Sequence, residues 1–226
     1  MCGRITQFSA IQEYAELFGI TSSLLSAPRY NVAPSSQITA CRLSTHGDRE
    51  LVSLHWGLIP SWSKGSDKRY SMINARAETV AEKPAYRGPF RKRRCLIPVD
   101  GFYEWKQDNG KQPYYIHACT NKPLVLAGIW DIWQDNTDNH IESCSIIVCP
   151  ANEQMQSIHD RMPVILPSAL WDRWLSGQDP GELKSMLTPS AEVLDIHPVS
   201  RAVNNPRNDN PDLINKFEPV AQTHNS

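Results

Sequence analysis

Apolar side chains recur with helical spacing in only a few short stretches of the chain. Residues 9–19 carry the i, i+3, i+4, i+7 spacing of an amphipathic helix on Ile11, Tyr14, Ala15 and Phe18. Ser9 and Gln12 fit a capping box at the start of this helix, and Gly19 fits its C-terminal stop. We therefore expect the chain to become ordered soon after its first residues.

Most other apolar stretches are short and rich in β-branched and aromatic residues, as strands are. Strands are expected at residues 38–45, 50–59, 95–106, 113–118, 124–134, 142–150, 162–166 and 191–200. Short helices are expected at residues 74–83, 152–160 and 167–177, the last with Trp171 and Trp174 on its buried face. The pattern predicts a single α+β domain over residues 1–226 with a mainly antiparallel, barrel-like β core and a polar tail from about residue 205.

Charge narrows the range of partners. The chain has 226 residues and a formal net charge of -1, which argues against a broad, nonspecific coat on nucleic acid. A local basic patch stays open, because residues 87–94 include Arg87, Arg91, Lys92, Arg93 and Arg94. This run is either a phosphate contact or a solvated face. No apolar run is long enough for a membrane helix, and no secretory signal or membrane partner is expected.

The cysteines point to one unusual position. Six are present, without a Cys-x-x-Cys pair and without a Cys/His cluster at zinc-ligand spacing, so no metal or cofactor is expected. Most lie in apolar runs and are expected to be buried, reduced thiols of a cytoplasmic protein. Cys2 differs because it directly follows Met1.

Removal of Met1 would leave Cys2 with a free α-amine and a thiol on adjacent carbons. Both groups are partly reactive near neutrality, with ordinary pKa values of about 8 and about 8.5. The thiolate could attack a carbonyl with the amine as its base. Alternatively, the amine could form a Schiff base with an aldehyde, and the thiol could close onto it as a thiazolidine. The remaining alternative is an unimportant cysteine at a mobile chain end.

Three further polar residues are candidates for acid/base and orienting roles, and each also has a structural explanation. Glu104 lies in an alternating strand and is either an acid/base group or part of a solvated face. His159 lies between a short helix and an apolar strand and is either structural or catalytic. Asn74 either orients a reacting group or caps the predicted helix. Asp160 and Arg161 fit a surface ion pair.

Seven motifs occur along the chain: MCGR, RYNVAPS, HWGLIPSW, INARAET, PVDGFYEWK, IHDRMPVIL and HPVSRAVN. In this order they resemble the SRAP (SOS-response-associated peptidase) family, from residue 2 to about residue 204. The resemblance implies an α+β domain with a curved β core that binds single-stranded DNA and junctions of single and double strands. It also implies a crosslinking, lyase-type activity, in which the N-terminal cysteine forms a thiazolidine with the opened sugar of an abasic site.

The resemblance also implies roles for particular residues. The implied catalytic residues are Cys2 as nucleophile, Asn74 as orienting group, Glu104 as acid/base and His159 as a second proton donor. The implied DNA contacts are Arg4, Arg76 and Arg161 on phosphates and Trp62 in stacking. Ser63 stands where some members have a second tryptophan, which leaves the details of base contact open. A monomer that acts on the nucleoid is expected.

Two other functions stay open. In a cysteine peptidase, Cys2 would be the nucleophile, His159 its base and Asn74 an oxyanion or orienting group. Such machinery could serve only to process the protein's own N-terminus. A reader of modified DNA bases would instead need a base-shaped aromatic pocket and would not need the Cys2 amine.

Overall fold

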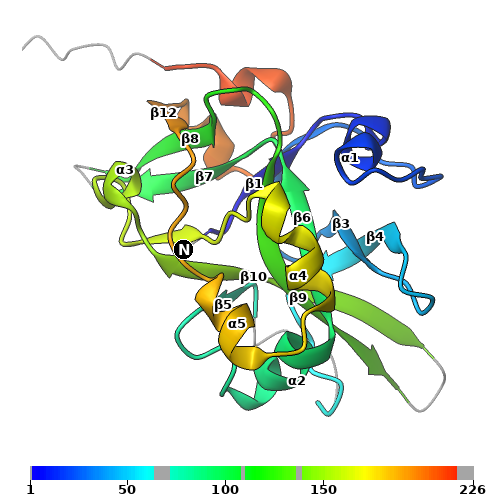
Figure 1. Ribbon diagram of the computed structural model, residues 1–226. Helices are drawn as coiled ribbons and strands as arrows, with labels where there is room; N and C mark the ends of the chain where they lie inside the picture. Colours follow the sequence, from blue (N-terminus) through cyan, green and yellow to red (C-terminus); the bar gives the residue numbers. More distant parts are fainter. Residues whose placement is uncertain (1, 64–71, 108–109, 136–138, 218–226) are drawn as a thin grey trace, which may run out of the picture.

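A closed β-barrel forms the centre of the computed structural model, which describes residues 2–63, 72–107, 110–135 and 139–217 (Figure 1). Its strands follow the order β10-β4-β3-β6-β9, and β9 pairs back with β10 to close the ring. The β4–β10 pair is parallel and the others are antiparallel. The barrel strands are β3 (Gln37–Leu43), β4 (Arg49–Trp56), β6 (Arg94–Val99), β9 (Leu124–Gln134) and β10 (His140–Pro150).

A second, fully antiparallel sheet lies beside the barrel, in the order β12-β8-β7-β1-β2. Its short strand β1 is central, and Ile5 pairs with Val32 on one side and Phe102 on the other. The sheet therefore holds the beginning of the chain between two strands. Its members are β1 (Ile5–Gln7), β2 (Arg29–Val32), β7 (Gly101–Lys106), β8 (Gln112–Ala118) and β12 (Leu194–Pro198).

The C-terminal half of β10 extends beyond the barrel and exchanges partners on both edges. One edge pairs with β4 at Ser143 and Cys144, and then with β5 (Asn74–Arg76) in parallel. The other edge leaves β9 after Ile146 and takes up β11 (Arg161–Pro163). This half of β10 thus brings Asn74 and Arg161 to the same end of the barrel.

Short helices cover the sheets, and the core is continuous beneath them. Trp56, Phe90, Phe102 and Trp174 are fully buried, and Trp171 is nearly so, as predicted for Trp171 and Trp174. The architecture confirms the predicted α+β class with a barrel-like core. No helix among the described residues has the length and apolar character needed to cross a membrane. The helices are α1 (Ile11–Leu17), α2 (Pro84–Lys92), α3 (Glu153–Gln156), α4 (Trp171–Ser176), α5 (Pro180–Ser185), and the 3-10 turns η1 (Ser168–Leu170), η2 (Arg201–Asn204) and η3 (Pro211–Ile214).

The helix predicted at residues 74–83 is wrong. Residues Asn74–Arg76 are strand β5, and turns follow up to the start of α2. Ala, Arg and Glu favour a helix locally, but backbone pairing with Ile146–Val148 of β10 outweighs that preference. Asn74 therefore caps no helix, and its side chain is available to the site.

The capping box predicted at Ser9 is also wrong, although the helix itself is present. Helix α1 begins at Ile11 after Ala10, without a side-chain cap. The Ser9 hydroxyl donates to Asp100 instead, and the same carboxylate accepts the Tyr14 hydroxyl at 2.7 Å. A carboxylate distant in sequence thus engages the hydroxyl that the local pattern assigned to the helix start. Gly19 ends the helix as predicted, with φ +66°.

The basic run at residues 91–94 is divided by the fold. Arg91 and Lys92 are exposed at the end of α2, while Arg93 pairs with Asp131 at 2.7 Å. Arg94 is 4% exposed. Its guanidinium donates to the carbonyls of Phe90, Trp174, Leu175 and Gly177. Only the first half of the run is therefore available to a partner.

Candidate functional site

Cys2 lies just before β1 and is completely buried. The Asn74 Nδ2 amide donates to the Cys2 carbonyl at 2.8 Å, across 72 residues of sequence. Asn74 is itself fixed by the parallel pairing of β5 with β10, and its carbonyl accepts the Tyr86 hydroxyl at 3.2 Å. The two sheets thus meet at the second residue of the chain.

Glu104 lies on β7, alongside the segment that leads into β1. The Tyr103 amide donates to the Arg4 carbonyl at 2.9 Å, which continues the β1–β7 pairing toward Cys2. Glu104 is 2% exposed, so the solvated-face alternative is wrong. The alternation correctly predicted extended structure here, but the single strand expected at residues 95–106 is two strands, β6 and β7, that lie in different sheets. Burial of the Glu104 face depends on the surrounding tertiary structure.

Burial shifts the pKa values of the Glu104 carboxyl and the Cys2 thiol. It raises the pKa of the Glu104 carboxyl above its usual range, and the imidazole of nearby His159 acts in the opposite direction. Burial also raises the pKa of the Cys2 thiol, with a further increase from the Glu104 charge. The thiol is therefore protonated at neutral pH, and the carboxyl is better suited to exchange protons than an exposed glutamate.

His159 follows α3 and precedes β11, as predicted. Its Nδ1 accepts the Arg161 backbone amide at 3.0 Å and lies 2.8 Å from the Asp160 carboxylate. One ring nitrogen cannot accept the first and donate to the second at the same time, so only one of these two contacts is a hydrogen bond in a given tautomer. The predicted Asp160–Arg161 ion pair is wrong, because the Arg161 side chain pairs with Glu78.

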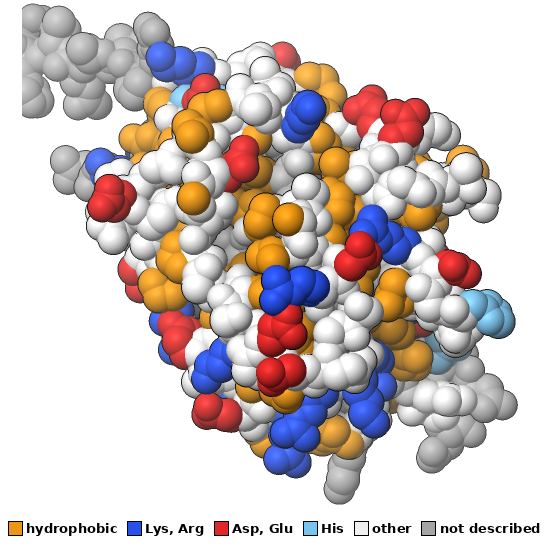
Figure 2. Space-filling model, in the orientation of Figure 1, with side chains coloured by type: hydrophobic (Ala, Val, Ile, Leu, Met, Phe, Trp, Pro, Cys, Tyr) orange, Lys and Arg blue, Asp and Glu red, His pale blue; other side chains and the backbone are white. Residues whose placement is uncertain are grey.

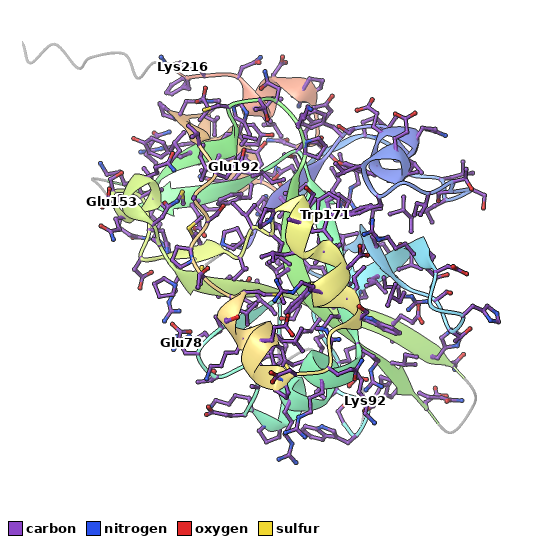
Figure 3. All side chains as sticks on the ribbon, viewed as in Figure 1. Glu78, Lys92, Glu153, Trp171, Glu192 and Lys216 are labelled. Atoms are coloured by element: carbon purple, nitrogen blue, oxygen red, sulfur yellow. The ribbon has the colours of Figure 1, made fainter. Side chains whose placement is uncertain are left out.

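The three predicted phosphate contacts differ in their surroundings. Arg76 is exposed at the end of β5, whereas Arg161 is partly buried by its ion pair with Glu78. Glu78 lies at the edge of the molecule on the left in Figure 3. Arg4 points inward, where Nη1 donates to Asn31 at 2.6 Å and to the Val203 carbonyl at 2.9 Å. Arg4 therefore links Asn31 and Val203 inside the molecule.

Trp62 is 66% exposed and lies against α2. It lines a surface cavity of about 490 Å³ together with Pro84, Arg87 and Gly88. Figure 2 shows Lys and Arg side chains gathered over α2, at the lower end of this face. An exposed aromatic ring beside an arginine suits stacking on a base next to a phosphate.

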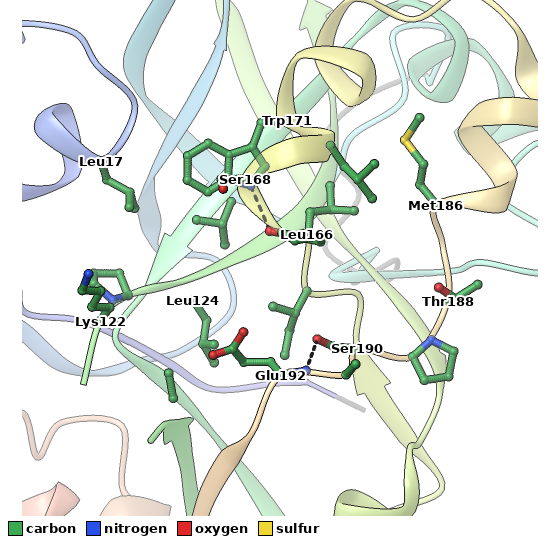
Figure 4. Close-up of a pocket in the computed structure, with 18 of the residues that line it drawn as sticks. Leu17, Lys122, Leu124, Leu166, Ser168, Trp171, Met186, Thr188, Ser190 and Glu192 are labelled. Carbon is green, nitrogen blue, oxygen red and sulfur yellow. Dashed lines mark hydrogen bonds between the residues drawn. The ribbon is translucent and has the colours of Figure 1, made fainter. Parts of the chain in front are cut away.

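A separate apolar cavity of about 820 Å³ lies between α1, α4 and the segment before β12 (Figure 4). Leu17, Leu124 and Met186 line it, and the Trp171 indole donates to the Leu166 carbonyl at 2.9 Å within it. None of the predicted catalytic residues lines this cavity. It is therefore distinct from the site around Cys2.

Three residues in the surroundings of the site were not singled out from the sequence. Asn31 binds Arg4, Tyr86 binds the Asn74 carbonyl, and Glu78 pairs with Arg161. Asn31 and Glu78 lie within the RYNVAPS and INARAET motifs, so those motifs contained a signal. Tyr86 precedes the basic run, and no local pattern indicated its role.

The chain is similar to known proteins in both sequence and fold. Residues 1–206 match the family model described as SOS response associated peptidase (SRAP). The abasic site processing protein YoqW of Bacillus subtilis is 41% identical over 222 residues, covering 95% of this chain and 99% of that protein. The abasic site processing protein HMCES of Gallus gallus is 34% identical, covering 84% and 67%. A crystal structure of a Bacteroides thetaiotaomicron protein superposes with a TM-score of 0.86 at 27% identity, covering 96% and 100%.

Proposed function

Because the chain belongs to the SOS response associated peptidase (SRAP) family, we propose that it processes abasic sites in DNA. In this proposal the protein binds single-stranded DNA or a strand junction that carries the lesion. Removal of Met1 makes Cys2 the N-terminal residue, and Cys2 then forms the covalent crosslink. The observation that carries the proposal is the hydrogen bond from Asn74 to the Cys2 carbonyl. It fixes the second residue of the chain, whose thiol interacts electrostatically with the buried Glu104.

The crosslink would form in two steps that together release one water. The Cys2 amine attacks the C1′ aldehyde of the opened sugar, and the carbinolamine loses water to give an imine. The Cys2 thiol then adds to the imine carbon, and its proton passes to the imine nitrogen. The product is a five-membered thiazolidine that joins protein and DNA.

The proton transfers are assigned to the two titratable side chains at the site. Glu104, with its raised pKa, would take a proton from the amine and return it to the departing water. His159 would donate to the sugar oxygen as the ring opens. A protonated Cys2 thiol suits this order, because the amine reacts first and the thiol adds afterwards.

The raised pKa of the Cys2 thiol weighs against a cysteine peptidase. A peptidase needs a thiolate, and thiolates form where positive charge lowers the thiol pKa. In the chain that retains Met1, burial and the Glu104 charge raise the pKa of the Cys2 thiol, while the positively charged N-terminus lowers it. A peptidase step limited to removal of an N-terminal extension would leave the aminothiol chemistry unchanged.

The proposed DNA contacts divide into surface and supporting residues. Arg76 and Trp62 are exposed and would bind a phosphate and a base directly. Arg161 would exchange Glu78 for a phosphate when DNA binds. Arg4 would act by positioning the segment that contains Cys2, since Asn31 and Val203 hold its guanidinium.

The test is to incubate the purified protein with single-stranded DNA that carries one abasic site, denature it and weigh the product. We expect a one-to-one adduct whose mass is the sum of both molecules minus one water. Cys2→Ala should abolish it, and Cys119→Ala, which removes an exposed internal thiol, should not. The mass of the free protein must also lack Met1.

The other outcomes would contradict the proposal. Peptide hydrolysis without an adduct would favour the peptidase. DNA binding unchanged by Cys2→Ala, again without an adduct, would favour a reader of modified bases. Sedimentation of the free and crosslinked protein would test the proposed monomer.

A further inference from the structure

Two histidines and an aspartate lie together on the outer sheet, away from Cys2. They come from adjacent strands, β8 and β12, at the end of the molecule where Lys216 is labelled (Figures 1 and 3). Asp195 pairs with His117 across the two strands, and His197 follows on the same face of β12. One ligand atom from each of the three residues lies within 4.8 Å of the other two.

Backbone carbonyls determine which nitrogen of each histidine carries the proton. The His117 Nδ1 lies 3.0 Å from the Ala118 carbonyl, and the His197 Nε2 lies 2.9 Å from the Ile214 carbonyl. A carbonyl can only accept, so these two nitrogens carry the hydrogens. The opposite nitrogens, Nε2 of His117 and Nδ1 of His197, are then left as acceptors in the neutral rings.

Both of these acceptors face a carboxylate. The His117 Nε2 lies 4.0 Å from Asp195 Oδ2, and the His197 Nδ1 lies 3.2 Å from Asp195 Oδ1. Three acceptors that converge without a hydrogen between them repel one another unless a cation joins them. We propose that His117, Asp195 and His197 bind a divalent transition metal, with Zn²⁺ as the first candidate.

The donor set and its support fit zinc. Two imidazoles and one carboxylate are common zinc ligands, with bonds of about 2.0–2.2 Å and tetrahedral angles, so ligand atoms end about 3.3 Å apart. The widest pair here would close by roughly 1.5 Å, within the reach of side-chain rotation. Hydrogen bonds from the remote histidine nitrogens to carbonyls are the usual support for ligating histidines.

The surroundings leave room for a fourth ligand. The three residues line a cavity of about 850 Å³, which also holds Asp100 and Lys216. These two charges oppose each other. Tyr14 and the Phe8 and Ser9 amides donate to the Asp100 carboxylate. Together, Asp100 and Lys216 add no net positive charge to the cavity that would repel a metal ion. A water or a small anionic ligand would complete the coordination.

The metal would fasten the C-terminal segment to the sheet. His197 is tied to Ile214 at the end of η3, and Val203 of η2 accepts Arg4. A metal that joins β12 to β8 would therefore stabilise the same segment that supports Arg4, near the N-terminal strand. This places a structural site at a distance from the proposed DNA chemistry.

Calorimetric titration of the chelator-treated full-length protein with Zn²⁺ at neutral pH tests the proposal. The background carries Cys2→Ala, because an N-terminal aminothiol would itself bind zinc. We expect one Zn²⁺ per chain and a rise in melting temperature on binding. His117→Gln and Asp195→Asn should each weaken binding by more than about 100-fold, since even second-shell changes cost 10–100-fold. His46→Gln, at an exposed histidine in a turn, should leave binding unchanged.

A second measurement keeps the result independent of variant folding. Co²⁺ loaded into the same protein should give visible absorption without a sulfur charge-transfer band, as expected for nitrogen and oxygen ligands. Failure of the protein to bind Zn²⁺ would overturn the proposal and favour an imidazolium–carboxylate ion pair. A sulfur band, or equal affinity in all variants, would also overturn it by locating the metal elsewhere.

Discussion

Replacement of Asn74 by alanine should reduce crosslinking while leaving the protein about as stable as before. The Asn74 Nδ2 amide donates to the Cys2 carbonyl at 2.8 Å, but its Oδ1 is buried and accepts no hydrogen bond from the described residues. Buried unsatisfied polar atoms are rare in folded proteins and need a specific explanation. In the proposed function, this amide is positioned for the reacting group.

The magnitude follows from two opposing contributions. Loss of the bond to Cys2 costs about 0.5–1.5 kcal/mol, and removal of a buried acceptor without a partner returns about 1–3 kcal/mol. The free energy of unfolding of Asn74→Ala should therefore fall by no more than about 0.5 kcal/mol relative to the unmodified protein. Loss of an orienting bond worth about 1.4 kcal/mol in the transition state would slow crosslinking about tenfold.

Asn31 provides a matched control, because it is buried with both ends of its amide engaged. Its Nδ2 donates to the carbonyls of Val203, Asn205 and Asn208, and its Oδ1 accepts Arg4. Asn31→Ala should lose about 2–4 kcal/mol. Urea unfolding of both variants and single-turnover crosslinking rates would check this contrast. Equal destabilisation by the two changes, or an unchanged rate in Asn74→Ala, would refute the reasoning.

Three further predictions concern separate parts of the molecule. Trp62→Ala should change the free energy of unfolding by less than about 0.5 kcal/mol but weaken single-stranded DNA binding by about 1–3 kcal/mol in a fluorescence titration; unchanged affinity would exclude stacking. Arg94→Met should destabilise by at least about 3 kcal/mol in urea, because four carbonyls lose their donor, whereas exposed Arg91→Met should not. Burial raises the pKa of Glu104, so the folded state binds the extra proton and stability falls as pH rises from the ordinary carboxyl value through the raised one. Glu104→Gln should remove this fall and slow crosslinking; a fall that persists in Glu104→Gln would assign it to another group.

Local sequence was sufficient where short-range chemistry decides the structure. The helix around Tyr14, its stop at Gly19 and the alternation through Glu104 were all predicted, since each depends on neighbouring residues. The motifs also indicated the family, because they keep the site residues in a recognisable order. The roles of Cys2, Asn74, Glu104 and His159 in the reaction remain predictions.

Tertiary contacts decided the rest. Asn74 lies in a strand because β10 offers an open edge, and Ser9 leaves the helix because Asp100 accepts its hydroxyl. Arg94 belonged to a basic run in the sequence, but the carbonyls around it make it part of the core.

The sequence by itself determined the class of fold, the order of most elements and the chemistry available at Cys2, because periodicity and residue type are local properties. Only the tertiary structure decided which polar groups are buried and which meet. His117 and His197 are 80 positions apart in number, and strand pairing alone brings them to one carboxylate. The physical reason is that burial and proximity depend on long-range packing, which changes the protonation and partners of a side chain without changing its identity.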